Sequence, residues 1–183
     1  MVYRKGCWTE CVMAIVKATY TKSGGGAKAS IRYMQHRKGK DGEQITRTLF
    51  GSDGLMGKWQ AYRLVEEAEK GSFFFRFVIS PDPKGEDSER DLFLREITEK
   101  TMLSLEERVH QPLSWVAVEH NDHAPHRHIH VLAVLPGRLQ VQHFQTMRQS
   151  ATAAALEQRK QRDLMQEQQA RMQGEGREWE LQR

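Results

Sequence analysis

Cysteine is scarce in this sequence. Only two cysteines occur among 183 residues, Cys7 and Cys11, and both lie near the start of the chain. They could form one disulfide, although we expect two reduced thiols. A zinc site built from cysteines is excluded, because two thiols need histidines from elsewhere to complete a tetrahedral ligand set.

Long apolar runs are also missing. No stretch of about 18 apolar residues occurs, so no transmembrane helix is expected. The opening MVYRKGCWTE has no apolar segment after its basic residues and does not resemble a secretory signal. We therefore expect a cytoplasmic protein without a membrane span. With 183 residues, 38% of them hydrophobic and 28% charged, the chain suits one soluble domain that can bury a core.

Acidic residues are few in the first part of the chain. Residues 1–50 contain 10 Lys and Arg against 3 Asp and Glu, whereas residues 51–183 contain 18 against 21. This asymmetry suits a positively charged face that meets phosphates. A solvated basic surface explains it equally well. Charge alone therefore permits nucleic-acid binding without arguing for it.

The order of expected elements indicates an α+β domain with a mostly antiparallel central sheet flanked by helices. Apolar periodicity and turn residues predict strands at 11–21, 44–51, 72–80, 113–120 and 128–135, and helices at 27–39, 55–70 and 88–111. A break at residues 23–26 precedes the first helix.

The strands 113–120 and 128–135 should be antiparallel neighbours because a short polar loop joins them. The helices 55–70 and 88–111 should cover one face of the sheet. A Gln- and Arg-rich helical extension, residues 139–183, should follow a domain formed by residues 1–138.

Five of the eight histidines fall between residues 120 and 130. His128 and His130 share a face of a predicted strand, and the hairpin brings His120 beside them. Three imidazoles that converge from adjacent strands leave open coordination positions, as a catalytic metal site requires. Asp122 is placed to orient one ligand by accepting its second ring N–H. The alternative is that histidines in a polar hairpin are merely exposed.

The segments HND (120–122) and PHRHIH (125–130) resemble the three-histidine motif of HUH endonucleases, particularly of MOB-type conjugative relaxases. A His-hydrophobic-His pair opens an apolar strand in that family. The resemblance therefore implies His120, His128 and His130 as ligands of a divalent ion, Mg²⁺ or Mn²⁺ before Zn²⁺ or Co²⁺. His126 is the reserve ligand, because the pair His126 and His128 matches the family's proline better.

The position of the tyrosines also resembles relaxases, which carry their nucleophile near the N terminus. None of the four tyrosines follows the histidines. ASIRYMQHRKG (29–39) resembles the first relaxase motif and implies Tyr33 as the nucleophile, with Tyr20 as the second candidate. A helix tyrosine packed on the sheet is the alternative for Tyr33. Ser80, which ends an apolar strand, is a weak match to the second relaxase motif.

The resemblance implies a strand-specific DNA nickase that acts at an origin of transfer during conjugation and forms a 5′-phosphotyrosine adduct. Its substrate would be single-stranded or locally melted DNA. An accessory DNA-binding protein is a possible partner, and the nuclease domain is expected to be monomeric. Four basic residues near Tyr33 suit phosphate contacts, or else charges at a helix end: Arg32, Arg37, Lys38 and Lys40.

Two other functions compete with this one. HRHIHVL (126–132) also resembles the signature of histidine-triad nucleotidyl hydrolases, in which the middle histidine attacks a phosphoanhydride without a metal. That alternative puts Arg127 where a hydrophobic residue belongs, and it leaves HND (120–122) and the Tyr33 segment unexplained. A nucleic-acid-binding module with incidental histidines is the third possibility.

Overall fold

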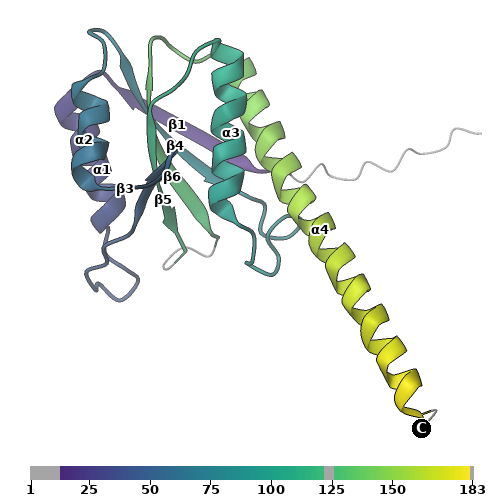
Figure 1. Cartoon of the computed structure of the whole chain (residues 1–183). Coiled ribbons are helices and arrows are strands. Elements are labelled where there is room, and N and C mark those ends of the chain that lie inside the picture. Colours follow the sequence, from purple (N-terminus) through teal and green to yellow (C-terminus); the bar gives the residue numbers. More distant parts are fainter. Residues whose placement is uncertain (1–12, 122–125, 182–183) are drawn as a thin grey trace, which may run out of the picture.

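The protein folds around a six-stranded sheet in which every pair of neighbouring strands is antiparallel (Figure 1). The computed structural model describes residues 13–121 and 126–181, and the side chains among these up to residue 173. The strand order is β1-β4-β6-β5-β2-β3. The strands are β1 (Ile15–Thr21), β2 (Leu49–Gly51), β3 (Gly54–Met56), β4 (Phe73–Ser80), β5 (Trp115–His120) and β6 (His128–Leu135). The expected α+β fold is confirmed, and β5 and β6 are adjacent central strands as predicted.

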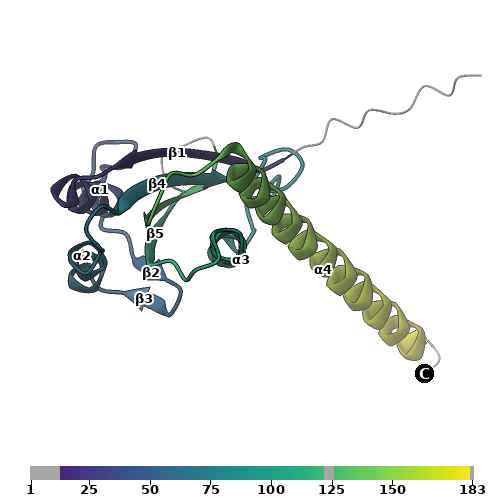
Figure 2. The ribbon, with the colours of Figure 1, turned by 90° about the horizontal axis from the view of Figure 1, so that it is seen from above.

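Four helices cover the two faces of the sheet (Figure 2). They are α1 (Gly24–His36), α2 (Lys58–Glu66), α3 (Leu94–Val109) and α4 (Val141–Leu181). Residues of α1 and α2 share one apolar cluster with the sheet, whereas residues of α3 and α4 share the other. The expectation that α2 and α3 cover the same face is therefore wrong. Both faces of the central strands are apolar, so each face needs its own helical layer.

The apolar side chains of β6 are divided between the two apolar clusters on either side of the sheet. Ile129 and Val131 belong to the α3 and α4 side, whereas Leu132 belongs to the α1 and α2 side. Successive side chains of a strand point to opposite faces, so His128 and His130 lie in the same row as Leu132. The two histidines consequently face α1.

The start of α1 differs from the prediction. Gly24 to Gly26 form its first turn and not a break before it, and the helix ends at His36 instead of Gly39. Ser23 is the N-cap, and its Oγ accepts a hydrogen bond from the Gly26 N–H at 3.2 Å. A capping hydroxyl satisfies one of the backbone donors that a helix start leaves without partners.

The starts of α2 and α3 were also predicted wrongly. Residues 54–56 pair with β2 as a hairpin, so α2 begins only at Lys58. α3 begins at Leu94 and not at Ser88. The segment before α3 is a loop in which the Asp87 carboxylate accepts the Leu92 N–H at 3.3 Å. Such side-chain acceptors offer the backbone an alternative to the helix.

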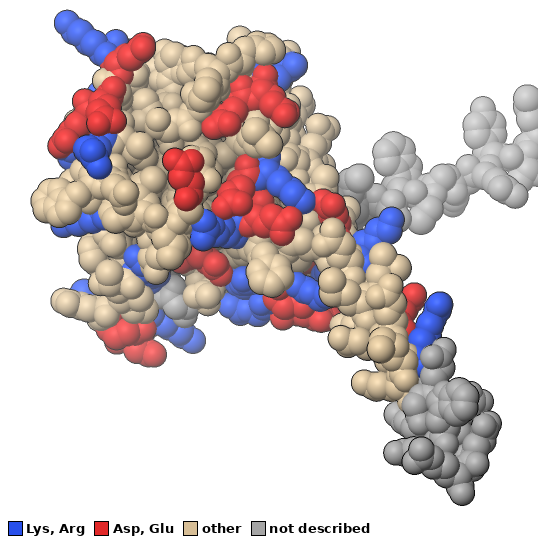
Figure 3. Space-filling model, in the orientation of Figure 1, with Lys and Arg blue, Asp and Glu red and all other residues tan. Residues whose placement is uncertain are grey.

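α4 extends well beyond the domain (Figure 1). Its first half packs on α3 and the sheet and buries Met147, Ala151, Ala154 and Ala155, whereas residues 163–173 are exposed. Within the described residues, no helix combines the length and apolar character needed to cross a membrane. Positive and negative side chains are interspersed on the face shown in Figure 3.

Candidate metal centre

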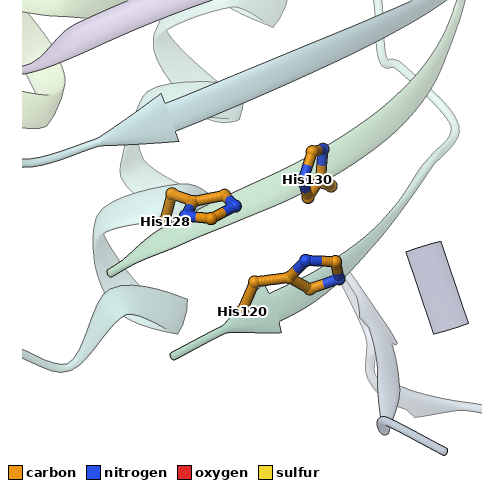
Figure 4. Close-up of side chains that lie close together, drawn as sticks. All are labelled: His120, His128 and His130. Atoms are coloured by element: carbon orange, nitrogen blue, oxygen red, sulfur yellow. The ribbon is translucent and has the colours of Figure 1, made fainter. Parts of the chain in front are cut away.

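Three histidines converge at the junction of β5 and β6 (Figure 4). His120 ends β5 and is directly opposite His128, the first residue of β6, and His130 follows two residues later on the same face. The ring centroids are 4.5 Å apart for His120 and His130, 5.0 Å for His128 and His130, and 5.5 Å for His120 and His128. One nitrogen from each ring lies within 4.8 Å of the others, so the group could hold a metal ion.

The hydrogen bonds of two rings fit this use. His120 Nε2 lies 2.8 Å from the Met34 carbonyl oxygen, and His128 Nδ1 lies 3.1 Å from the His126 carbonyl oxygen. A carbonyl can only accept, so each of these nitrogens carries the proton. In a neutral ring the lone pair is then on the other nitrogen, Nδ1 of His120 and Nε2 of His128. Metal-binding histidines characteristically donate their second N–H to a carbonyl or carboxylate, which fixes the ring orientation.

Helix α1 closes the site on one side. Met34 and Ile31 are buried against the sheet, and the Met34 carbonyl holds His120, which is itself fully buried. Three imidazole ligands, two of them with a tautomer fixed by a hydrogen bond, suit a borderline divalent ion such as Zn²⁺ or Co²⁺. Metal coordination at about 2.0–2.2 Å requires the three nitrogens to lie roughly 3 Å from one another.

The other residues predicted for the metal site have different outcomes. His126 is exposed, lies before the start of β6, and does not belong to the cluster of three. Of the two possible ligand pairs, the structure brings His128 and His130 together with His120. Asp122 lies outside the described residues.

The two candidate tyrosines lie on opposite faces of the sheet. Tyr33 is on α1 and lines a pocket of about 460 Å³ together with His130. Tyr20 is on β1, and its ring contacts Phe73 and Phe75, with centroids 5.3 Å away in both cases. Both phenylalanines belong to the α3 and α4 side. Only Tyr33 therefore shares a face with the histidines, as an in-line attack beside the metal site requires.

Ser80 has a partner that its sequence position did not suggest. Its Oγ donates to the Arg127 carbonyl oxygen at 3.0 Å. The Arg127 side chain reaches the opposite layer, where its guanidinium donates to Asp87 at 3.3 Å, to Glu119 at 3.1 Å and to the Leu92 carbonyl at 2.9 Å. Hydrogen bonds thus hold both the main chain and the side chain of Arg127, which directly precedes His128 at the start of β6. Ser80 contributes to this anchoring through its hydroxyl.

The predicted phosphate-binding residues follow α1 or lie on it. Arg32 is exposed on the helix, whereas Lys38 and Lys40 are exposed in the loop after it. Arg37 is half-buried at the helix end, with its guanidinium carbon 5.8 Å from the centre of the Tyr33 ring.

Two further cations were not found from the sequence. Lys17 on β1 and Arg76 on β4 line the same pocket as Tyr33 and His130. One signal existed for Arg76, because it is the only charged residue in the strand FFFRFVIS. The pairing of β1 with β4 brings the two together, and that pairing joins segments far apart in the chain.

Comparison with known proteins adds no relative. No protein-family model, no curated protein and no solved structure matches this chain. The geometry of the site and the resemblance of its motifs are therefore the basis for inferring a function.

Proposed function

We propose that the protein is a metal-dependent DNA nickase of the HUH relaxase type, which cleaves single-stranded DNA through Tyr33. The observation that carries the proposal is the joint placement of a three-histidine cluster and an exposed tyrosine. His130 of the cluster and Tyr33 line one pocket. Nucleophile, phosphate and metal must share a small volume in a transesterification.

The chemistry is an exchange of one phosphodiester for another. The Tyr33 hydroxyl oxygen attacks the scissile phosphorus and gives up its proton, and the bond from phosphorus to the 3′ oxygen breaks. The leaving 3′ oxygen takes up a proton. The products are a 5′-phosphotyrosine and a free 3′-OH, and the covalent bond preserves the energy needed for rejoining.

His120, His128 and His130 would hold the divalent cation. When bound, such a cation polarises the phosphate oxygens and stabilises the charge of the in-line transition state. The chain's own contribution would be orientation: the Met34 carbonyl accepts a hydrogen bond from the His120 ring, and α1 carries Tyr33, which lines the same pocket as His130. Conjugative transfer, with a transfer origin as the natural substrate, is the biological setting that the motif resemblance implies.

One observation weighs against a histidine-triad hydrolase. That chemistry needs three alternating histidines on one strand, yet β6 begins at His128 and His126 is exposed before it. The third member of the cluster is His120 from the neighbouring strand, which the hydrolase mechanism does not use.

The direct test is incubation with labelled single-stranded oligonucleotides and Mn²⁺, followed by denaturing gels. We expect a covalent protein–DNA band that disappears with chelator and in His128→Ala. His143→Ala is the matched control, because His143 lies at the start of α4 and away from the cluster. Chelator-resistant hydrolysis of dinucleoside polyphosphates, without any adduct, would instead establish the histidine-triad mechanism.

A further inference from the structure

The pocket beside the histidine cluster has a basic wall. Its volume is about 460 Å³, and its polar lining comes from β1, β4, β6 and α1. The polar residues are Lys17, Thr19, Ser30, Tyr33, Arg76 and His130. Ser30 already donates its hydroxyl to the Gly26 carbonyl at 2.9 Å. The two cations on the strands therefore define the charge of the part of the lining that the sheet contributes.

Strand register fixes where these cations lie relative to the histidines. Lys17 is paired with Val78, and Val78 with His130, so the three form one row across the sheet. Two strand spacings place the Cα atoms of Lys17 and His130 roughly 10 Å apart. Arg76 is paired with Thr19 in the next row, diagonal to Lys17. The basic wall thus begins one strand away from the metal site and continues to the sheet edge.

Within residues 13–121 and 126–173, neither cation has a structural partner that explains it. Both side chains are exposed, and among the described residues no carboxylate forms an ion pair with either of them. Arg127 shows the contrasting case, since Asp87 and Glu119 pair with it. Diagonal neighbours on a sheet are roughly 7–8 Å apart, so two like charges at Lys17 and Arg76 repel each other. An anionic ligand between them removes that repulsion.

We infer that Lys17 and Arg76, assisted by the Thr19 hydroxyl, bind backbone phosphates of the DNA strand beside the phosphate at the histidines. The inference rests on the proposed function and deepens it. The bound DNA would then run from the histidine cluster across β4 to β1. It would pass along the side of α1 that carries Tyr33. The ligand class is a phosphodiester chain, because two cations and a hydroxyl donor suit the charged, hydrogen-bond-accepting oxygens of backbone phosphates.

The test compares Lys17→Gln/Arg76→Gln with Lys160→Gln/Arg171→Gln, which removes the same charge from the exposed side of α4. Binding of a labelled single-stranded oligonucleotide is followed by fluorescence anisotropy at several salt concentrations, in chelator. Each lost phosphate contact lowers the salt slope by about 0.7, so we expect a decrease of about 1.4 and roughly tenfold weaker binding at low salt. Mn²⁺ binding, measured by calorimetry, should be unchanged, and the melting temperature should not fall.

Three other results would overturn the inference. If the pocket variant binds DNA with the wild-type slope, the subsite is wrong while the nickase proposal stands. Equal weakening in the α4 control would mean that only net charge matters. If the wild-type protein binds no single-stranded DNA, the proposed function fails and the subsite fails with it.

Discussion

Tyr33 and Met34 are neighbours on α1 with opposite surroundings. Met34 is 2% exposed and its carbonyl accepts a hydrogen bond from His120, whereas Tyr33 is 56% exposed. A tyrosine kept for packing buries its ring and leaves only the hydroxyl near water. Tyr33 instead lines the pocket that also contains Arg76 and His130. Its exposure costs the fold little and leaves the hydroxyl accessible to a ligand.

We therefore expect Tyr33→Phe to separate binding from chemistry. The substitution removes one oxygen and almost no packing, so the free energy of unfolding should change by less than about 0.5 kcal/mol. Oligonucleotide affinity should be within about twofold of wild type, since phosphate contacts supply most of it. Adduct formation on a denaturing gel should be lost. Tyr20→Phe is the control; an adduct that persists in Tyr33→Phe but disappears in that control would assign the nucleophile to the other face.

The histidine cluster makes a prediction that does not depend on catalysis. An ion that binds only the folded state raises its stability by RT ln(1 + [L]/Kd), or about 2.7 kcal/mol at a hundredfold excess over Kd. Mn²⁺ or Zn²⁺ should raise the melting temperature of the wild-type protein, and chelator should reverse the change. His128→Ala should fold but lose this response, and His126→Ala should keep it. If the response disappears in His126→Ala and survives in His130→Ala, the ligand pair is His126 and His128 instead.

At the scale of elements, the β5–β6 hairpin is anchored from the layer opposite to the histidines. Arg127 is mostly buried, with 11% of its side chain exposed, and Asp87 is at 4%. The pair joins the loop before α3 to the first residue before β6, and Ser80 adds a hydrogen bond from β4. The ion pairs of Arg127 with Asp87 and Glu119 therefore explain why an arginine stands between His126 and His128. Its partners Asp87 and Glu119 lie away from the histidine cluster.

We expect Arg127→Met to lose both stability and metal affinity. Removing one partner leaves the Asp87 charge buried, which costs about 3–5 kcal/mol. Asp87→Asn added to this variant removes that charge and retains an acceptor for the Leu92 N–H, so part of the stability should return. Denaturant unfolding measures the first effect and Mn²⁺ calorimetry the second. Restored stability with metal affinity still weakened would identify positioning of His128; full recovery of both would make the arginine merely structural.

At the scale of the whole molecule, the sequence pattern correctly predicted those elements that depend on interactions between residues close together in the chain. The apolar run 128–135 became β6 with the predicted bounds, because a central strand is specified by its own β-branched and apolar residues. The hairpin then brought His120 to His128. The start of α3 was predicted wrongly because the carboxylate of Asp87 satisfies the backbone of a loop. The basic wall of the pocket was missed because it depends on the pairing of β1 with β4, which no local pattern contains.

The long helix α4 gives the last prediction. Its first half is part of the domain: Ala151 and Ala155 are fully buried, and Arg162 forms an ion pair with Asp91 in the loop before α3. Partial burial opposes ionisation of Asp91, but the charge and hydrogen bond of Arg162 hold its pKa below the ordinary value. Beyond this pair, residues 163–173 are exposed. Residues 163–173 therefore contribute little to folding.

We expect a chain that ends after residue 166 to unfold with a free energy within about 0.5 kcal/mol of the full chain, because exposed residues far from such anchors rarely matter. Ala151→Leu in the full chain should instead cost about 1–3 kcal/mol, since it overfills a packed interface. Denaturant unfolding at two protein concentrations measures both effects. A truncated chain that loses stability, with the loss growing at the higher concentration, would show that the distal helix packs against a second copy. Equal stability at both concentrations would leave the distal helix as an arm that extends from a self-sufficient domain.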